Sequence, residues 1–258
     1  MADAFYTRTG ANTFTPSPMT GSPWGPDTQH AGPPAALLVR ALEQHESPAP
    51  QRLRRVCLDI LAPVLMGELS VEVRVVKPGK RAGLVEARAS IGGRAVLAAR
   101  GWLLTSVSEG FPAPPTDDAP AEPPAPAGEV DLPGAYMHGY MSAVDWRFES
   151  GSFDSFGPAV AWARPLVPLL AGEDLTPWQR TVILVDSASG VSLVAHPREH
   201  PLVNCDLNVV LHRDPIGEWI RIDASTTVSG GHGASTHAAL SDRLGPVGDS
   251  TQTLFSLE

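Results

Sequence analysis

Cysteine is nearly absent from this chain, which has only Cys57 and Cys205 in 258 residues. The two are far apart and form no CxxC spacing, so the sequence supports neither a disulfide framework nor a cysteine-based zinc site. Long apolar runs are also missing, because the best candidate, residues 94–107, is interrupted by Arg100 and is shorter than the roughly 18 residues of a membrane helix. The amino terminus lacks a basic start followed by an apolar stretch, which a secretory signal needs. We therefore expect a soluble, cytoplasmic protein without a membrane partner.

Positive charge is scarce as well. The chain has 19 Lys and Arg against 28 Asp and Glu, which gives a formal net charge of -9. A protein that binds nucleic acid through its phosphates needs a basic face, so we expect no nucleic-acid partner. The GxSxG motif of α/β serine hydrolases is absent. His196 and His200 have a metal-ligand spacing, but Pro197 and Pro201 argue against a helix there, and we expect no metal.

Proline, by contrast, is abundant and unevenly distributed. Eight of the 26 prolines lie between Gly110 and Gly134. This stretch has neither a helical nor a strand period, and it cannot bury enough apolar surface to offset the entropy lost on ordering. We interpret residues 110–135 as a linker between an amino-terminal repeat, residues 1–109, and a carboxy-terminal repeat, residues 136–258.

The two repeats show the same order of predicted elements. The first has an apolar helix and then four strands, at 35–42, 56–61, 69–75, 87–91 and 95–104. The second has the same order, at 176–187, 205–212, 220–228, 235–242 and 247–257. Pro177 suits the first turn of the second helix, and the dipeptide Gly-Glu opens a strand in both repeats, at 67–68 and 217–218. One helix followed by antiparallel strands, made twice, predicts an α+β fold.

Five segments carry a resemblance to a known family. They are HAGPPAALLVRAL at 30–42, RRVCLDILAPVLMGEL at 54–69, NCDLNVVLHRDPIGEW at 204–219, DAST at 223–226 and GPVGDSTQTL at 245–254. In this order they resemble the double hotdog acyl-CoA thioesterases, the type II bacterial thioesterase group. The resemblance implies two tandem repeats, each a curved antiparallel sheet around a central helix, with the sheets joined edge to edge. It also implies hydrolysis of an acyl-CoA substrate to free acid and CoA, with no cofactor.

The resemblance further implies the residues that activate water. In active members an Asp, a Thr and a Gln of the second repeat position the water that attacks the thioester, and the matching residues are Asp206, Thr226 and Gln252. A one-residue gap in the loop at 214–217 leaves Thr227 as an alternative to Thr226. We prefer Thr226 because it follows Asp223-Ala224 as in the closer relatives.

Two residues at the start of the first helix are candidates for substrate binding. The backbone near Gly32 offers unpaired N–H donors that could bind the thioester oxyanion, although Pro33 and Pro34 contribute none. His30 precedes this helix and either lines the pocket or lies at the surface. Trp24, with Trp146, Trp162 and Trp178, is interpreted as a core residue.

Strand counting supports the grouping of the three water-activating residues without reference to the family. The turns at 215–216 and 243–245 and the loop at 230–233 place Asp206, Thr226 and Gln252 in one band across the sheet. Counting does not settle which face each side chain occupies, because a one-residue bulge reverses it. The corresponding positions of the first repeat hold no carboxylate, hydroxyl or amide, which predicts one polar site per chain.

Two rival functions stay open. A hotdog dehydratase or hydratase would need a pocket histidine or an Asp/His pair, and no histidine occupies the matching positions. A non-catalytic acyl-CoA or acyl-chain binding protein would keep the fold without turnover. Lys80, Arg81 and Arg213 are candidate contacts for the CoA phosphates. Two fused repeats already supply the paired interface of a dimer, so we expect an active monomer, with further association left open.

Overall fold

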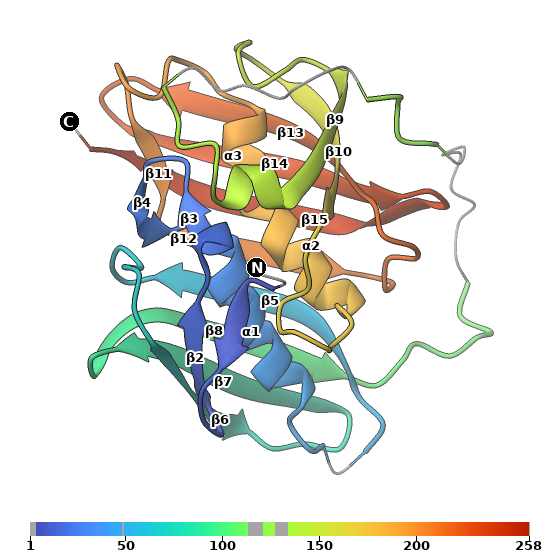
Figure 1. The fold of residues 1–258 in the computed structure, drawn as a ribbon. Helices are drawn as coiled ribbons and strands as arrows, with labels where there is room; N and C mark the ends of the chain where they lie inside the picture. Colours follow the sequence, from blue (N-terminus) through green and yellow to red (C-terminus); the bar gives the residue numbers. More distant parts are fainter. Residues whose placement is uncertain (1–3, 48, 113–120, 127–133, 258) are drawn as a thin grey trace.

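One antiparallel sheet forms the body of the molecule. The structure is a computed structural model that describes residues 4–47, 49–112, 121–126 and 134–257. In these residues thirteen strands form the sheet, and two central helices, α1 (Gly32–Glu43) and α2 (Pro177–Val185), lie against its inner face (Figure 1). This arrangement is the predicted double hotdog, an α+β fold with two tandem repeats.

Each repeat follows the same path through its sheet. The first repeat contributes four strands, β5 (Arg52–Ile60), β6 (Leu69–Lys77), β7 (Ala82–Ile91) and β8 (Arg94–Leu104). The second contributes β12 (Asp206–Leu211), β13 (Ile220–Ser229), β14 (Gly233–Asp242) and β15 (Gly245–Ser256). In both, the fourth strand returns beside the first, in the orders β6-β7-β8-β5 and β13-β14-β15-β12. All eight overlap the strands predicted from alternation, whereas the repeat boundaries at 109 and 136 stay a prediction.

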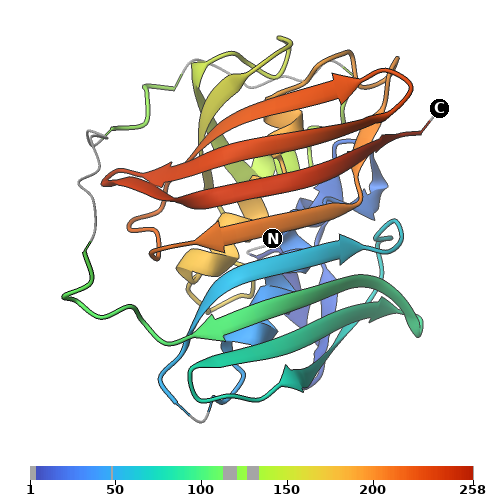
Figure 2. The same cartoon turned by 180° about the vertical axis from the view of Figure 1, so that it is seen from behind.

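The two repeats join edge to edge. Strand β5 pairs with β12 in antiparallel register, with Leu58 opposite Leu207 and Asp59 opposite Asp206. Seen from behind, the strands of both repeats form one continuous face, and the helices lie on its far side (Figure 2). The outer face of one repeat therefore continues into the outer face of the other.

The remaining elements extend or cover the sheet. They are β1 (Tyr6–Arg8), β2 (Thr13–Pro16), β3 (Gly21–Ser22), β4 (Gly25–Gln29), β9 (Val144–Ser150), β10 (Ala159–Pro165), β11 (Leu202–Asn204), the short helix α3 (Ala188–Val191) and two 3-10 helices, Pro18–Thr20 and Tyr140–Ala143. Strands β1 and β2 continue the sheet beyond β6, β9 and β10 continue it beyond β13, and β3 and β4 form a separate hairpin. None of these was predicted from the sequence.

The two central helices pack against each other in opposite directions. At one end, a Cβ on Gly32 would overlap the carbonyl oxygen of Ile183 and lie 3.0 Å from its carbonyl carbon, so only glycine permits the close approach. At the other end, Glu43 accepts hydrogen bonds from Thr176 Oγ1 at 2.8 Å and Gln179 Nε2 at 3.1 Å. The end of α2 is thereby fixed beside the start of α1.

The beginning of α2 confirms its predicted start. Thr176 is the N-cap, and its hydroxyl accepts the backbone N–H of Gln179 at 3.1 Å, while Pro177 occupies the first turn. Within the described part of the chain, no helix is both long and apolar enough to cross a membrane.

Candidate active site

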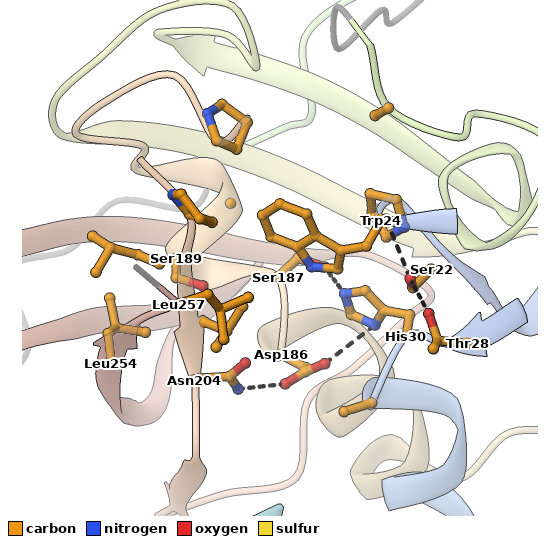
Figure 3. A pocket seen from close by; sticks show the side chains of 18 of the residues that line it. Ser22, Trp24, Thr28, His30, Asp186, Ser187, Ser189, Asn204, Leu254 and Leu257 are labelled. Carbon is orange, nitrogen blue, oxygen red and sulfur yellow. Dashed lines mark hydrogen bonds and ion pairs between the residues drawn. The ribbon is translucent and has the colours of Figure 1, made fainter. Parts of the chain in front are cut away.

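A cavity of about 760 Å³ opens between the two repeats' central elements and the carboxy-terminal strand. Its walls are largely apolar, with Ile60, Met141 and Phe153 among them. Its polar lining includes His30, Asp186, Ser187, Ser189, Asn204 and Thr226, together with Ser22, Thr28, Gln29, Arg198 and His200. Figure 3 shows His30, Asp186 and Asn204 pointing toward one another. The cavity thus combines largely apolar walls with a polar end, which is formed by His30, Asp186 and Asn204.

A buried carboxylate and an imidazole form the centre of this polar end. Asp186 is the C-cap of α2, and His30 stands two residues before α1. Asp186 Oδ2 lies 3.2 Å from His30 Nδ1, and the two side chains are only 3% and 12% exposed. Asp186 Oδ1 accepts a hydrogen bond of 2.9 Å from Asn204 Nδ2. The antiparallel packing of the helices brings the pair together, since it places the end of α2 beside the start of α1.

The His30 ring contacts Tyr140 and Ser187 in addition to Asp186. Its ring stacks on Tyr140 with centroids 3.7 Å apart and planes 5° from parallel. Its Nε2 lies 3.3 Å from Ser187 Oγ, which is itself 2.9 Å from the Tyr140 hydroxyl. Burial lowers the pKa of His30 from its ordinary 6.5, although the charge of Asp186 opposes this shift. The imidazole is therefore neutral at pH 7.

The tautomer of His30 follows from its neighbours. The backbone N–H of Gly32 points at Nδ1, with the two nitrogens 3.2 Å apart, and a carboxylate oxygen of Asp186 also lies 3.2 Å from Nδ1. Nδ1 either accepts from Gly32 or donates to Asp186. We assign the proton to Nδ1, because a carboxylate is the stronger acceptor and stabilises the tautomer that donates to it. Nε2 is then the proton acceptor, and in this tautomer the Gly32 N–H no longer donates to Nδ1. Gly32 is not among the described residues that line the cavity, so its contact with substrate stays a prediction.

Gln252 supports the backbone on which Asp186 stands. Its side chain is 2% exposed, its Nε2 donates to the carbonyl oxygen of Asp186 at 3.0 Å, and its Oε1 accepts the N–H of Ser189 at 3.1 Å. The amide therefore fixes the turn after α2. The family resemblance implies that Gln252 positions the attacking water, whereas in the structure both polar ends of its side chain have protein partners.

Thr226 points into the molecule and lines the cavity. Its hydroxyl lies 2.8 Å from Ser192 Oγ and 2.7 Å from Thr236 Oγ1. Thr227 is exposed, so Thr226 is the threonine of the two that faces the cavity. The register places Thr226 opposite Thr236, and Thr236 opposite Gln252. The predicted band across these strands is confirmed.

Asp206 lies in the same band but on the other face of the sheet. Its Oδ1 accepts the backbone N–H of Thr253 at 2.6 Å, and its Oδ2 accepts the Thr253 hydroxyl at 3.2 Å, both near the surface. Side chains alternate along β15, so Gln252 points inward and Thr253 outward. Asp206 is not among the cavity-lining residues, and the expectation that it would share a site with Thr226 and Gln252 is corrected here.

A bulge at Cys205 explains why Asn204 reaches the cavity. Asn204 pairs with Leu254, and Asn208 pairs with Thr251. Four residue steps on one side (204 to 208) therefore face three on the other (254 to 251), which is the geometry of a β-bulge. The extra residue turns Asn204 inward, whereas Asp206 points outward because it alternates with the buried Leu207 and Val209 along β12.

One further expectation about the surroundings is corrected, and another stays a prediction. Trp24 is 52% exposed and lines the cavity, so it is not a core residue, whereas Trp162 is fully buried. Of the candidate CoA contacts, Lys80 and Arg81 lie in the turn between β6 and β7, outside the lining. Arg213 is bound to Asp242 through both of its terminal nitrogens, at 2.5 and 2.6 Å.

Asp186 and Asn204 were missed in the sequence, although both left a signal there. Asp186 is a single acid at the end of the apolar run Val182–Val185, where a charge is costly unless it has partners. Asn204 opens the same motif, NCDLNVV, from which Asp206 was chosen. In the described residues, no group of three His, Cys, Asp or Glu side chains is placed to hold a metal.

Comparison with known families identifies the family of this two-repeat chain. The acyl-CoA thioesterase N-terminal domain matches residues 20–104, and the acyl-CoA thioesterase C-terminal domain matches residues 114–256. The chain belongs to the acyl-CoA thioesterase family. No curated protein matches it.

Solved structures support the fold over the whole chain. A protein of Novosphingobium aromaticivorans DSM 12444, provisionally named a thioesterase, has a TM-score of 0.70 at 18% identity and covers 97% of this chain and 98% of its own. The tesB protein of Mycobacterium avium subs. paratuberculosis has a TM-score of 0.65 at 17% identity, with 100% and 98% covered. A hot dog protein of unknown function from Alicyclobacillus acidocaldarius has a TM-score of 0.69 at 16% identity, with 100% and 97% covered.

Proposed function

We propose that the protein hydrolyses acyl-CoA thioesters in this cavity, with His30 and Asp186 activating the attacking water. The observation that carries the proposal is the buried pair itself, a neutral imidazole 3.2 Å from a carboxylate at the polar end of an apolar cavity. Family membership supplies the substrate class, and the apolar walls suit an acyl chain.

The proposed chemistry needs one base that first takes a proton and then returns it. His30 Nε2 accepts a proton from water as the water oxygen attacks the thioester carbonyl carbon, and Asp186 stabilises the imidazolium that forms. When the carbon–sulfur bond breaks, His30 gives the proton to the departing sulfur. The products are the free acid and the CoA thiol. The attacking water replaces the long 3.3 Å contact between Nε2 and Ser187 Oγ.

The surrounding polar groups have positioning roles in this proposal. Asn204 holds one carboxylate oxygen of Asp186 and Gln252 holds its backbone, so the other oxygen is directed at His30. Thr226 lines the same cavity and is the proposed hydroxyl contact of the water or thioester. We propose Asp186 in the role that the family resemblance implies for Asp206, since Asp186 is the carboxylate that lines the cavity.

A hotdog hydratase or dehydratase is the second candidate, because one observation favours it. In the sequence, no histidine occupies the positions that such an enzyme would use. In the structure, His30 and Asp186 form an Asp/His pair. Such an enzyme would use the pair to move a proton and a water across a 2-enoyl thioester. The matches to acyl-CoA thioesterase domains over most of the chain favour hydrolysis over this alternative.

A thiol-release assay over a series of saturated acyl-CoA chain lengths tests the proposal. The same preparation is given a 2-enoyl-CoA, and hydration is followed by loss of the enoyl absorbance. Release of CoA thiol from saturated esters supports hydrolysis. Hydration without thiol release identifies the second candidate function, a hydratase or dehydratase. Tight binding of acyl-CoA with neither reaction identifies an acyl-CoA binding protein.

A further inference from the structure

We infer that Arg198 binds a phosphate group of the CoA moiety at the mouth of the cavity; this inference rests on the proposed function. Arg198 is the one lysine or arginine among the described cavity-lining residues. It lies on the segment between α3 and β11, is exposed to solvent, and follows Pro197, which also lines the cavity. The acyl group enters the apolar space, so the CoA portion must lie toward this exposed rim.

The side chain of Arg198 is available for a ligand. In the parts of the chain that the structure describes, its guanidinium has no carboxylate partner. Other arginines are engaged, for example Arg40 with Glu173 at 2.7 Å and Arg221 with Glu149 at 2.9 Å. Glu199 is adjacent in sequence but is not among the cavity-lining residues. An unpaired guanidinium at the rim of a cavity suits a phosphate, which it binds with two parallel hydrogen bonds.

Gly134, which also lines the cavity, lies close against the Arg198 side chain. Gly134 has a φ of +78°, in the left-handed region that favours glycine. A Cβ at this position would overlap Arg198 Nε and lie 2.9 Å from its Cδ and 3.3 Å from its Cζ. The Arg198 side chain therefore lies flat against the Gly134 backbone. Because this contact already restricts the side chain, Arg198 loses less conformational entropy when it binds an anion.

The charge of the whole chain makes a local cation necessary. CoA carries a diphosphate and a 3′-phosphate, and the chain has a formal net charge of -9, so the overall field does not attract this ligand. Lys80, Arg81 and Arg213, which the sequence suggested, are outside the lining or bound to Asp242. Arg198 is then the cation through which the cavity distinguishes a CoA ester from a thioester without phosphates.

The test compares R198Q with the wild type on three thioesters of one acyl group: acyl-CoA, acyl-dephospho-CoA and acyl-pantetheine. We expect KM for acyl-CoA to rise about 10- to 100-fold, the range of a lost charge-assisted hydrogen bond, with kcat within about twofold. KM for acyl-pantetheine stays unchanged. If R198Q alters KM for acyl-dephospho-CoA, the contact is to the diphosphate; if it does not, the contact is to the 3′-phosphate. G134A is expected to raise KM for acyl-CoA in the same direction.

The matched control is R94Q, which removes an exposed arginine of β8 outside the lining and should leave all three KM values unchanged. An unchanged KM for acyl-CoA in R198Q overturns the inference, as does an equal loss on acyl-pantetheine. A wild type that hydrolyses no thioester refutes the proposed function instead. In that case calorimetric titration with CoA itself decides, since equal affinity of wild type and R198Q overturns the phosphate contact.

Discussion

Asp186 and Asp206 provide a matched pair of substitutions, because both are carboxylates of the second repeat and only Asp186 lines the cavity. Asp186→Asn keeps the oxygen that accepts from Asn204, but it removes the charge 3.2 Å from His30 Nδ1. The amide no longer stabilises an imidazolium and can favour the wrong tautomer. Loss of a general base or of its carboxylate partner typically costs about 10²- to 10⁴-fold. We therefore expect kcat to fall by at least about 10²-fold.

Asp206→Asn is the control on the outer face. Asparagine still accepts a hydrogen bond from Thr253 near the surface, so the expected cost is about 0.5 to 1 kcal/mol of stability. We expect turnover to stay within about twofold of wild type. Both variants are assayed by thiol release at saturating acyl-CoA, and a melting curve of each checks folding. If Asp206→Asn abolishes turnover while Asp186→Asn retains it, the site lies on the other face and the assignment from the cavity lining fails.

Three further outcomes are expected. Because burial lowers the pKa of His30 and its neutral form is the base, kcat/KM should fall on the acid side only below pH 6.5, and an acid limb above 6.5 in a pH profile would contradict this. Ser187→Ala should keep kcat within about fivefold, since water and not Ser187 is the nucleophile; an acyl-enzyme trapped on Ser187 and seen by mass spectrometry would refute it. Asp242 has a fully buried side chain, and burial would raise its pKa, but hydrogen bonds from Arg213, Ile216 N–H and Leu244 N–H lower it below 3.8. Its contribution to stability is therefore present above pH 3.8 and lost as the pH falls through the lower folded value. Asp242→Asn should cost about 2 to 4 kcal/mol in urea unfolding at pH 7, and a cost below about 0.5 would show that the pair contributes little.

The regular part of the fold could be predicted because its signals are local. Strands β13 to β15 alternate inward and outward residues, and α2 carries both a cap at Thr176 and a proline in its first turn. Strand β4 could not be found this way, since its sequence GPDTQ has no alternation and its place depends on pairing with β3. Within the predicted linker, residues 113–120 and 127–133 lie outside the described residues.

The candidate site was predicted only in part, for a different reason. Strand counting gave the correct height of Thr226, Gln252 and Asp206, because height depends on residue number. The outward face of Asp206 follows from alternation with the buried Leu207 and Val209, which counting from distant turns did not use. The inward face of Asn204 depends on the single extra residue at Cys205, which leaves no mark in the sequence. The pairing of His30 with Asp186 joins residues 156 positions apart (186 − 30) and depends on how the two helices pack.

Thiol release by the wild type and by His30→Gln, measured side by side on the best acyl-CoA, tests the central claim most directly. Glutamine keeps a polar side chain in the buried position but cannot accept a proton from water at neutral pH. We predict that the wild type turns over many equivalents of acyl-CoA and that His30→Gln loses at least about 10²-fold in kcat with an unchanged melting temperature. Equal turnover by the two proteins, or no turnover by a folded wild type on any acyl-CoA, would contradict the account.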